Sequence, residues 1–337
     1  MNQLNLPFIR SLKIKPVLDG IEAIYQVKMI GEFIPASIFD NAMTLIPVTA
    51  IQEWLELAEK LTGDPLFMIK IAQFIQLEQL GGVGKWFASS PDFSLAFRRI
   101  NYGIGHLQSG ASYYGSQSGK LIKWSYHCDS FTGQARHHDS LRIAILMRSI
   151  LIEYLGDDYV PTRVRLCGFV EDATEVEQLF GCDIEWNCPQ TEVWLNIRVL
   201  LVEGKNDYQE YQSMSLPFFR LDDFLNMPQA NDHAKIVYEV INYSRHFGYP
   251  TVDKAASCFN LSRQQFQRRL TRFGWNFSML TGYILGNLAI QFMVKGVPLA
   301  TISESLGYKS IASFNKSFKN LRGQTPNQYL SRLKNKQ

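Results

Sequence analysis

The chain has 337 residues, of which 46% are hydrophobic and 19% are charged, and its formal net charge at pH 7 is +3. These values are ordinary for a folded soluble protein, and the length predicts two domains. No stretch reaches the roughly 18 uninterrupted apolar residues of a membrane span. The N-terminal sequence MNQLNLPFIRSLK lacks the apolar core of a signal peptide. We therefore expect a cytoplasmic protein with no membrane partner.

The first predicted elements are helices. The segment 46–63 carries its apolar residues on one side and ends at Thr62-Gly63, which is typical of an amphipathic helix. The segments 64–76 and 90–107 each begin at a cluster of aspartate, serine and proline, so they are predicted as two further helices.

Strand signals follow these helices. The segment 118–129 alternates, with Ile122, Trp124, Tyr126 and Cys128 on one face, and is predicted as a strand. A long helix is predicted over 132–156. Short strands are then expected at 163–170 and 191–197, on either side of the segment 172–186. Helices with a small mixed sheet predict an α+β domain over residues 1–212, and they make a Rossmann sheet less favoured.

Aromatic and polar residues in this part of the chain are candidates for a small-molecule pocket. They combine aromatic walls with polar groups on segments that are expected to border one cavity. Packing of the same aromatic side chains in an ordinary core is the alternative interpretation. The candidate effector-binding residues are Tyr113, Trp124, Tyr126, His127 and Arg142.

Catalytic and metal-binding motifs find little support. His137 and His138 invite a metal interpretation together with Cys128, His127 and Asp139, but adjacent residues of a helix point about 100° apart. The glycine-rich stretch GGVGK lacks the spacing of a phosphate loop, and neither GxSxG nor HExxH occurs. We therefore expect no enzyme, no cofactor and no metal.

The cysteines indicate a reducing compartment. They number five, an odd count, with no CxxC pair and no histidine at zinc-finger spacing. Reduced and mostly buried thiols are therefore expected. The residues are Cys128, Cys167, Cys182, Cys188 and Cys258.

Charge separates the chain into two parts. Residues 233–337 contain 15 lysines and arginines against three acidic residues, a net charge of +12, whereas residues 1–232 have a net charge of −9. Such a basic segment predicts a module that binds a polyanion. A linker is expected over 213–232, because Pro217 and Pro228 disfavour helix there.

A repeat appears beyond this linker. Residues 252–274 and 299–323 both place apolar residues at helical spacing around a short central turn. Asn260 and Gly307 occupy matching places in the turns, where a residue that tolerates positive φ is required. Ser262 and Ser310 are predicted N-caps, and Gly274 and Gly323 close the second helices. Each copy therefore predicts a helix-turn-helix unit.

The second helix of each copy is predicted to bury one face and to expose another. Phe266, Leu270 and Phe273 are expected to face inward in the first copy, and Phe314, Phe318 and Leu321 in the second. Arginine bonds to guanine and glutamine bonds to adenine through paired hydrogen bonds, so the outward face is predicted to enter a DNA groove. A solvated basic face is the alternative. The candidate DNA-binding residues facing out are Arg263, Gln264, Gln267, Arg268, Arg272, Ser313, Asn315, Lys316 and Lys319.

These residues carry a family resemblance. The stretch 236–330 resembles the DNA-binding domain of AraC/XylS-type transcription regulators, most specifically in GYKSIASFNKSFKNLRGQTPNQYL. The resemblance implies an all-α domain over 233–337, with two helix-turn-helix units joined by the helix MLTGYILGNLAIQFMVKG. It also implies two successive major-groove contacts, roughly 34 Å apart. Asn287 and Asn260 depart from the family's usual arginine and glycine. The base-reading positions implied are Gln264, Gln267 and Arg268, and then Ala312, Ser313, Asn315 and Lys316.

The stretch 24–208 is similar to the arabinose-binding-like sensory and dimerisation domain that accompanies such DNA-binding domains. The similarity lies in GDPLF, SSPDFSLAFRRI, VPTRVRL and FGCDIEW. We therefore expect a sequence-specific transcription regulator that binds double-stranded DNA. A small-molecule effector and a second copy of the chain are candidate partners, and RNA polymerase is another if the protein is an activator.

Two alternatives stay open. In the first, the N-terminal domain is a dimerisation platform without a ligand. In the second, the protein is an enzyme or an adaptor whose basic C-terminal segment only anchors it to nucleic acid.

Overall fold

A computed structural model describes residues 4–204 and 226–334. The chain forms two compact units. The N-terminal unit contains Pro7–Phe33 and Ala42–Met227, and the C-terminal unit contains Met1–Leu6, Ile34–Asn41 and Pro228–Gln337. Two short segments of the expected first domain thus group with the C-terminal residues. Most of the expected linker, residues 213–225, lies outside the described residues.

A mixed sheet organises the N-terminal unit. Its five strands follow the order β3-β4-β7-β5-β6, and all neighbours are antiparallel except β5 and β6, which are parallel. The expected α+β class with a small mixed sheet is therefore confirmed. The strands are β3 Ala111–Ser118, β4 Leu121–Cys128, β5 Arg163–Arg165, β6 Ile184–Glu185 and β7 Thr191–Asn196, and a separate pair is formed by β1 Phe8–Arg10 and β2 Leu45–Pro47.

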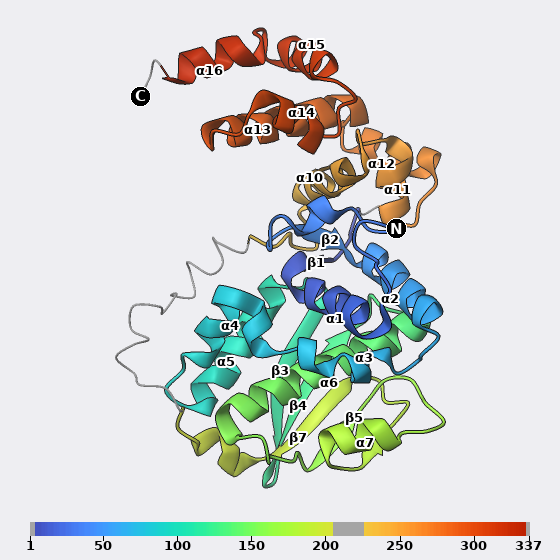
Figure 1. The fold of residues 1–337 in the computed structure, drawn as a ribbon, viewed down its shortest axis with the longest axis vertical. Helices are drawn as coiled ribbons and strands as arrows, with labels where there is room; N and C mark the ends of the chain where they lie inside the picture. Colours follow the sequence, from blue (N-terminus) through green and yellow to red (C-terminus); the bar gives the residue numbers. More distant parts are fainter. Residues whose placement is uncertain (1–3, 205–225, 335–337) are drawn as a thin grey trace. The chain divides into compact units, whose positions relative to one another are not determined.

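Alternation along β4 sets the two faces of this sheet. Trp124 lies opposite Val193 and Tyr126 lies opposite Thr191, and all four residues are buried. The long helix α6, Gly133–Leu155, is buried along most of its length and crosses the sheet (Figure 1). Successive strand residues point to opposite faces, so the sheet residues between these positions lie on the other face.

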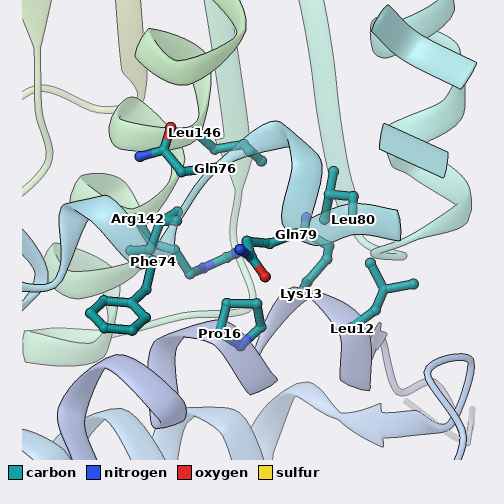
Figure 2. A pocket seen from close by; sticks show the side chains of 10 residues that line it. Leu12, Lys13, Pro16, Phe74, Gln76, Gln79, Leu80, Arg142 and Leu146 are labelled. Carbon is teal, nitrogen blue, oxygen red and sulfur yellow. The ribbon is translucent and has the colours of Figure 1, made fainter. Parts of the chain in front are cut away.

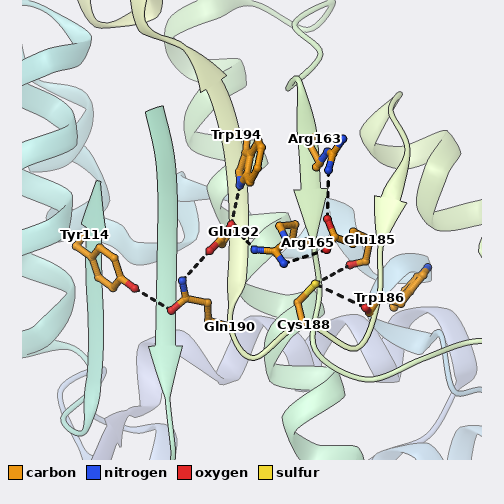
Figure 3. A network of polar contacts seen from close by, with 9 residues as sticks. All are labelled: Tyr114, Arg163, Arg165, Glu185, Trp186, Cys188, Gln190, Glu192 and Trp194. Carbon is orange, nitrogen blue, oxygen red and sulfur yellow. Dashed lines mark hydrogen bonds and ion pairs between the residues drawn. The ribbon is translucent and has the colours of Figure 1, made fainter. Parts of the chain in front are cut away.

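The other face of the sheet carries a network of charged and aromatic side chains (Figure 3). Arg165 donates to Glu185 at 2.9 Å and to Glu192 at 3.0 Å. Glu192 also accepts from the Trp194 indole at 2.6 Å and from Gln190 at 2.7 Å. The hydrogen bonds to Glu185 and Glu192 raise the pKa of the Arg165 guanidinium, so it stays charged.

Among the described residues, the other helices of this unit are α1 Lys15–Tyr25, α2 Val48–Thr62, α3 Phe67–Lys70, α4 Gly81–Ala88, α5 Phe93–Gly103 and α7 Thr174–Phe180. The 3-10 turns in the described part of the chain are η1 Ser11–Lys13, η2 Ala36–Phe39, η3 Ala72–Phe74, η4 Leu77–Leu80, η5 Ile104–His106, η6 Ile197–Leu201 and η8 Arg245–Phe247.

One helix prediction in this unit was wrong. The segment 64–76 breaks into α3 and η3, although it was expected to be one helix. After η3, the Gln76 side-chain amide donates to the Ala72 carbonyl at 2.8 Å, and the Ser149 hydroxyl accepts from the Leu77 backbone amide at 2.7 Å.

The C-terminal unit is all-helical, as expected. In chain order its helices are α10 His233–Ser244, α11 Val252–Cys258, α12 Arg263–Arg272, α13 Phe277–Val294, α14 Leu299–Ser305, α15 Ile311–Arg322 and α16 Pro326–Lys334. The pairs α11–α12 and α14–α15 form the two expected helix-turn-helix units, and α13 connects them. Phe266, Leu270, Phe314 and Phe318 are almost completely buried, so they supply the aromatic and aliphatic core of these units.

The turns of the two units have the same backbone geometry. Asn260 has φ of 53° and Gly307 has φ of 78°. In the first turn the Leu261 amide bonds to the Ala256 carbonyl at 3.1 Å, and in the second the Tyr308 amide bonds to the Ser303 carbonyl at 3.0 Å. Both bonds span five residues, which is the pattern of a helix end closed by a left-handed residue.

Two of the expected inward residues are partly exposed. Phe273 has 36% of its surface exposed and stacks on Trp275, with ring centroids 4.8 Å apart. α12 already ends at Arg272, so Phe273 leaves the helical periodicity. Leu321 is 39% exposed, and it covers Gly286 of α13 so closely that a Cβ there would meet its side chain.

Among the described residues, α13 is long and apolar enough to cross a membrane, with a mean hydropathy of 1.4 over 18 residues. This property is also common in the core helices of soluble proteins. α13 packs on α10, α14 and α15, and 39% of its residues are buried. Its Asn287, at the position where the family's usual arginine was expected, accepts a hydrogen bond from Arg322 of α15.

Replacing Gly307 by alanine is expected to destabilise the C-terminal unit strongly. A Cβ at this position would lie 2.3 Å from the carbonyl of Gly248 and would also force alanine into a left-handed conformation. The conformation alone costs ~1–2 kcal/mol. Gly274→Ala is the matched control, because Gly274 has a similar φ of 74° and open space around it. Thermal unfolding of both variants should show a clearly larger decrease in Tm for Gly307→Ala; equal decreases would contradict the close approach.

Candidate functional site

The outward face of α12 is the first candidate surface. Phe266 and Leu270 anchor the helix, and the Phe266 ring stacks on Phe259 with centroids 5.3 Å apart. Ser262 and Gln265 form a reciprocal capping box that fixes the first turn. The five candidate residues on this helix are all exposed: Arg263, Gln264, Gln267, Arg268 and Arg272. α12 is thus held rigidly, and it exposes three guanidinium groups and two side-chain amide groups.

Arg263 pairs with a carboxylate of the same unit. Arg263 lies 3.2 Å from Asp253 of α11, and both side chains are more than half exposed. Exposed pairs of this kind contribute ~0–1 kcal/mol. The guanidinium can therefore exchange this carboxylate for a phosphate or a base without a large loss of stability.

The outward face of α15 is the second candidate surface, and its chemistry differs. Ala312, Lys316 and Lys319 are exposed. The Ser313 hydroxyl donates to the Ser310 carbonyl at 2.7 Å and belongs to the capping box of this helix. Asn315 is half-buried, and its Oδ1 is buried without a hydrogen-bond partner. The second helix thus offers two free ammonium groups but fewer side chains suited to reading bases.

The candidate effector residues do not form one group. Tyr113, Tyr126 and Arg142 lie together in the interior of the N-terminal unit. Trp124 is elsewhere, donating to Asn101 at 2.8 Å beside the rings of Phe93 and Phe97.

His127 is also separate from that group. It lies 3.1 Å from Asp129, on the opposite face of β4 from Tyr126, and its side chain is 41% exposed. The sequence alternation placed Tyr126 and Trp124 on one face correctly but gave no information on their distance from Arg142.

Five buried side chains form what we call the buried polar cluster: Lys13, Gln108, Tyr126, Asp139 and Arg142. Gln108 is at its centre. Its carbonyl oxygen accepts from Lys13 Nζ at 2.8 Å and from Arg142 Nη2 at 3.2 Å, and its amide donates to the Tyr126 hydroxyl at 2.7 Å. Tyr126 then donates to Asp139 at 2.5 Å, and Arg142 Nε donates to the other Asp139 oxygen at 3.1 Å.

The charges of this cluster do not balance. It contains two basic side chains and one carboxylate, and each is at most 4% exposed. Burial raises the pKa of both Tyr113 and Tyr126, so the phenols stay neutral. Burial, followed by the nearby Arg142 charge, lowers the pKa of Lys13 well below its usual value. When Lys13 is protonated, the interior therefore carries an unbalanced positive charge.

Sequence reasoning missed Lys13 and Gln108 and considered Asp139 only as a metal ligand. A signal for the Asp139–Arg142 pair exists, because opposite charges three residues apart on a helix are neighbours. Gln108 follows η5 and has no local pattern that distinguishes it from a surface residue. Only the fold brings it between β4, α6 and η1.

Replacing Asp139 by asparagine is expected to destabilise the N-terminal unit by about 3–5 kcal/mol, because Arg142 would lose its buried counter-charge. Asp129→Asn is the control, since the Asp129 side chain is 85% exposed and such a change is expected to stay within ~0.5 kcal/mol. Urea unfolding of the full chain measures both values. A small effect of Asp139→Asn would show that this ion pair is not needed in the interior.

Residues 33–201, half of the chain, match the family model described as the N-terminal arabinose-binding domain of AraC transcription regulator. Residues 255–332 match a helix-turn-helix domain model. No curated protein matches at a significant level.

Two solved structures are similar. The crystal structure of the transcriptional regulator CdpR from Pseudomonas aeruginosa has a TM-score of 0.48 at 15% identity, covering 95% of this chain and 98% of that one. A DNA-binding transcriptional dual regulator from Escherichia coli K-12 has a TM-score of 0.27 at 28% identity, covering 28% of this chain and 86% of that one. On the strength of the two family models, the chain belongs to the AraC-type DNA-binding transcription regulators, with an arabinose-binding-like N-terminal domain.

Proposed function

We propose that this regulator reads a specific DNA sequence by inserting α12 and α15 into consecutive major grooves. The supporting observation is the repetition of one design. Buried Phe266 and Leu270 hold α12, and buried Phe314 and Phe318 hold α15. Each helix begins with a capping box at a serine N-cap and follows a turn residue in the left-handed conformation. The major groove admits an α-helix, and a helix that is held rigidly keeps its side chains aligned with the base edges.

The two helices have different roles in DNA binding. α12 discriminates bases through Gln264, Gln267 and Arg268, because amide and guanidinium groups form paired hydrogen bonds with adenine and guanine. α15 mainly positions the protein through Lys316 and Lys319, because an ammonium group is suited to phosphate and Ser313 is engaged in its cap. Ala312 and Asn315 lie on this same helix and make closer, less discriminating contacts with the groove.

The N-terminal unit senses a small effector and changes DNA binding through a difference in affinity for two states. Support comes from the buried polar cluster, which places the side chains of Lys13, Asp139 and Arg142 in the interior of this unit. A homodimer is the proposed assembly, and RNA polymerase is the further partner if the protein activates transcription. The site of action is the cytoplasm.

Replacing Arg268 by alanine is expected to remove discrimination at one base position by about 1–3 kcal/mol while other positions keep theirs. The measurement is selection of the full-length protein on random double-stranded DNA near physiological salt. Lys295→Ala is the control, because it removes an equal charge at the exposed end of α13. Equal weakening on every sequence by Arg268→Ala would favour the alternative in which the basic segment is a nonspecific anchor.

Replacing Lys319 by alanine is expected to weaken DNA binding equally on all sequences. The slope of log K against the logarithm of the salt concentration should become less steep by ~0.9, the value of one phosphate contact. Gln267→Ala should leave that slope unchanged, because glutamine carries no charge. Fluorescence anisotropy over a series of salt concentrations measures both slopes. If Lys319→Ala instead altered the selected sequence, the division between the two helices would be wrong.

A further inference from the structure

The cavity beside the buried polar cluster and the open edge of the sheet differ in what they can accept. The cavity that borders Lys13 and Arg142 has a volume of about 20 Å³, which is room for about one water molecule (Figure 2). It does not accommodate a larger partner. The edge strand β3 is open to solvent instead, because six of its eight residues are exposed.

The backbone of β3 is paired on one side only. It is the first strand in the order β3-β4-β7-β5-β6, and all of its residues pair with β4 without a bulge. The loop of this hairpin has two residues, so pairs that exchange two hydrogen bonds begin at Ser118–Leu121 and recur at every second residue. The amide and carbonyl groups of Tyr113, Gly115 and Gln117 therefore point away from β4. In the described parts of the chain these groups form no backbone hydrogen bond with another segment.

The sequence of β3 lacks the usual protection of an edge strand. Natural edge strands avoid pairing with other chains by being short or by carrying lysine, proline or a bulge. β3 has eight residues, and its sequence ASYYGSQS contains neither a charge nor a proline. The opposite edge strand, β6, has two residues and includes Glu185. Tyr114 does not cover the edge of β3, since its hydroxyl donates at 2.8 Å to Gln190, beyond β4 (Figure 3).

A second copy of the same strand is the occupant that this edge fits. In an antiparallel pair with a two-fold axis, each strand meets its own sequence, so a charge near the axis would lie close to its like charge. An uncharged strand avoids this repulsion. A two-fold axis at Tyr114 would place Tyr113 of each copy opposite Gly115 of the other, where outward amides meet outward carbonyls. Both long edges are then paired, so the assembly closes as a dimer.

We propose that two copies of the chain pair through their β3 strands, antiparallel, and join two five-stranded sheets into one. The inference rests on the homodimer proposed above and assigns its interface. Such a dimer carries two DNA-binding units. It therefore binds DNA that contains the recognised motif twice more tightly than DNA that contains it once.

Sedimentation equilibrium of the full-length protein measures the association, and hydrogen exchange at low and high protein concentration tests the interface. The peptide that covers Ala111–Ser118 should exchange more slowly at concentrations where the dimer forms. A dimer in which exchange of this peptide does not depend on concentration would refute the proposal. A protein that stays monomeric while this peptide exchanges slowly would show that another segment of the same chain pairs with β3, and would also refute it.

The variant Gln117→Pro removes an amide that points away from β4, a position at which edge strands tolerate proline. Each dimer would lose two hydrogen bonds, so association should weaken by about tenfold or more. Gln117→Lys places a charge on the edge and should also weaken association. Gln134→Lys is the control, because Gln134 is exposed at the start of α6 and should leave association unchanged. Unchanged association in whichever Gln117 variant folds would place the dimer interface elsewhere and overturn the assignment.

DNA selection separates this inference from the proposed function. A dimer that persists in Gln117→Pro would refute the β3 interface and leave the homodimer in place. A monomeric protein that selects a DNA motif would refute the interface and the dimer but leave the reading of DNA intact. Loss of the dimer in Gln117→Pro, with weaker binding only to DNA that contains the motif twice, would support the interface and its role.

Discussion

Burial of one phenylalanine at the centre of each recognition helix is the constraint on which the DNA-binding unit depends. Phe266 and Phe314 are at most 1% exposed, and their burial fixes the rotation of α12 and α15 about their own axes. The rotation in turn decides which side chains face outward, among them those proposed to contact DNA. Since a helix repeats every 3.6 residues, a rotation by one residue would turn this outward face by about 100°.

The same unit is stabilised by close backbone approaches and by caps. Gly307 lies against Gly248, and Leu321 lies over Gly286, so small residues let the helices meet where side chains would separate them. The capping boxes at Ser262 and Ser310 satisfy backbone amides at the starts of α12 and α15. The same local geometry therefore holds α12 and α15 rigidly and orients their outward faces.

The N-terminal unit follows a different principle, because its interior contains charge. The sheet and α6 form an ordinary apolar core on one side of Trp124, but beside Tyr126 the same layer holds Asp139, Arg142 and Lys13. Buried ionic groups seldom add to stability, and an unbalanced set is more costly than a balanced one.

The sequence by itself determined the elements whose signals are local. Helix periodicity, serine caps and left-handed turn residues identified both helix-turn-helix units, because these features depend on neighbours within a few residues. Local pattern also predicted β4 and α6. It failed for 64–76, which breaks into α3 and η3, and for Phe273, which lies past the end of α12. Only the tertiary structure brought Lys13 and Gln108 to Asp139 and Arg142, because hydrogen bonds across 95 and 34 residues of chain have no local sequence signature.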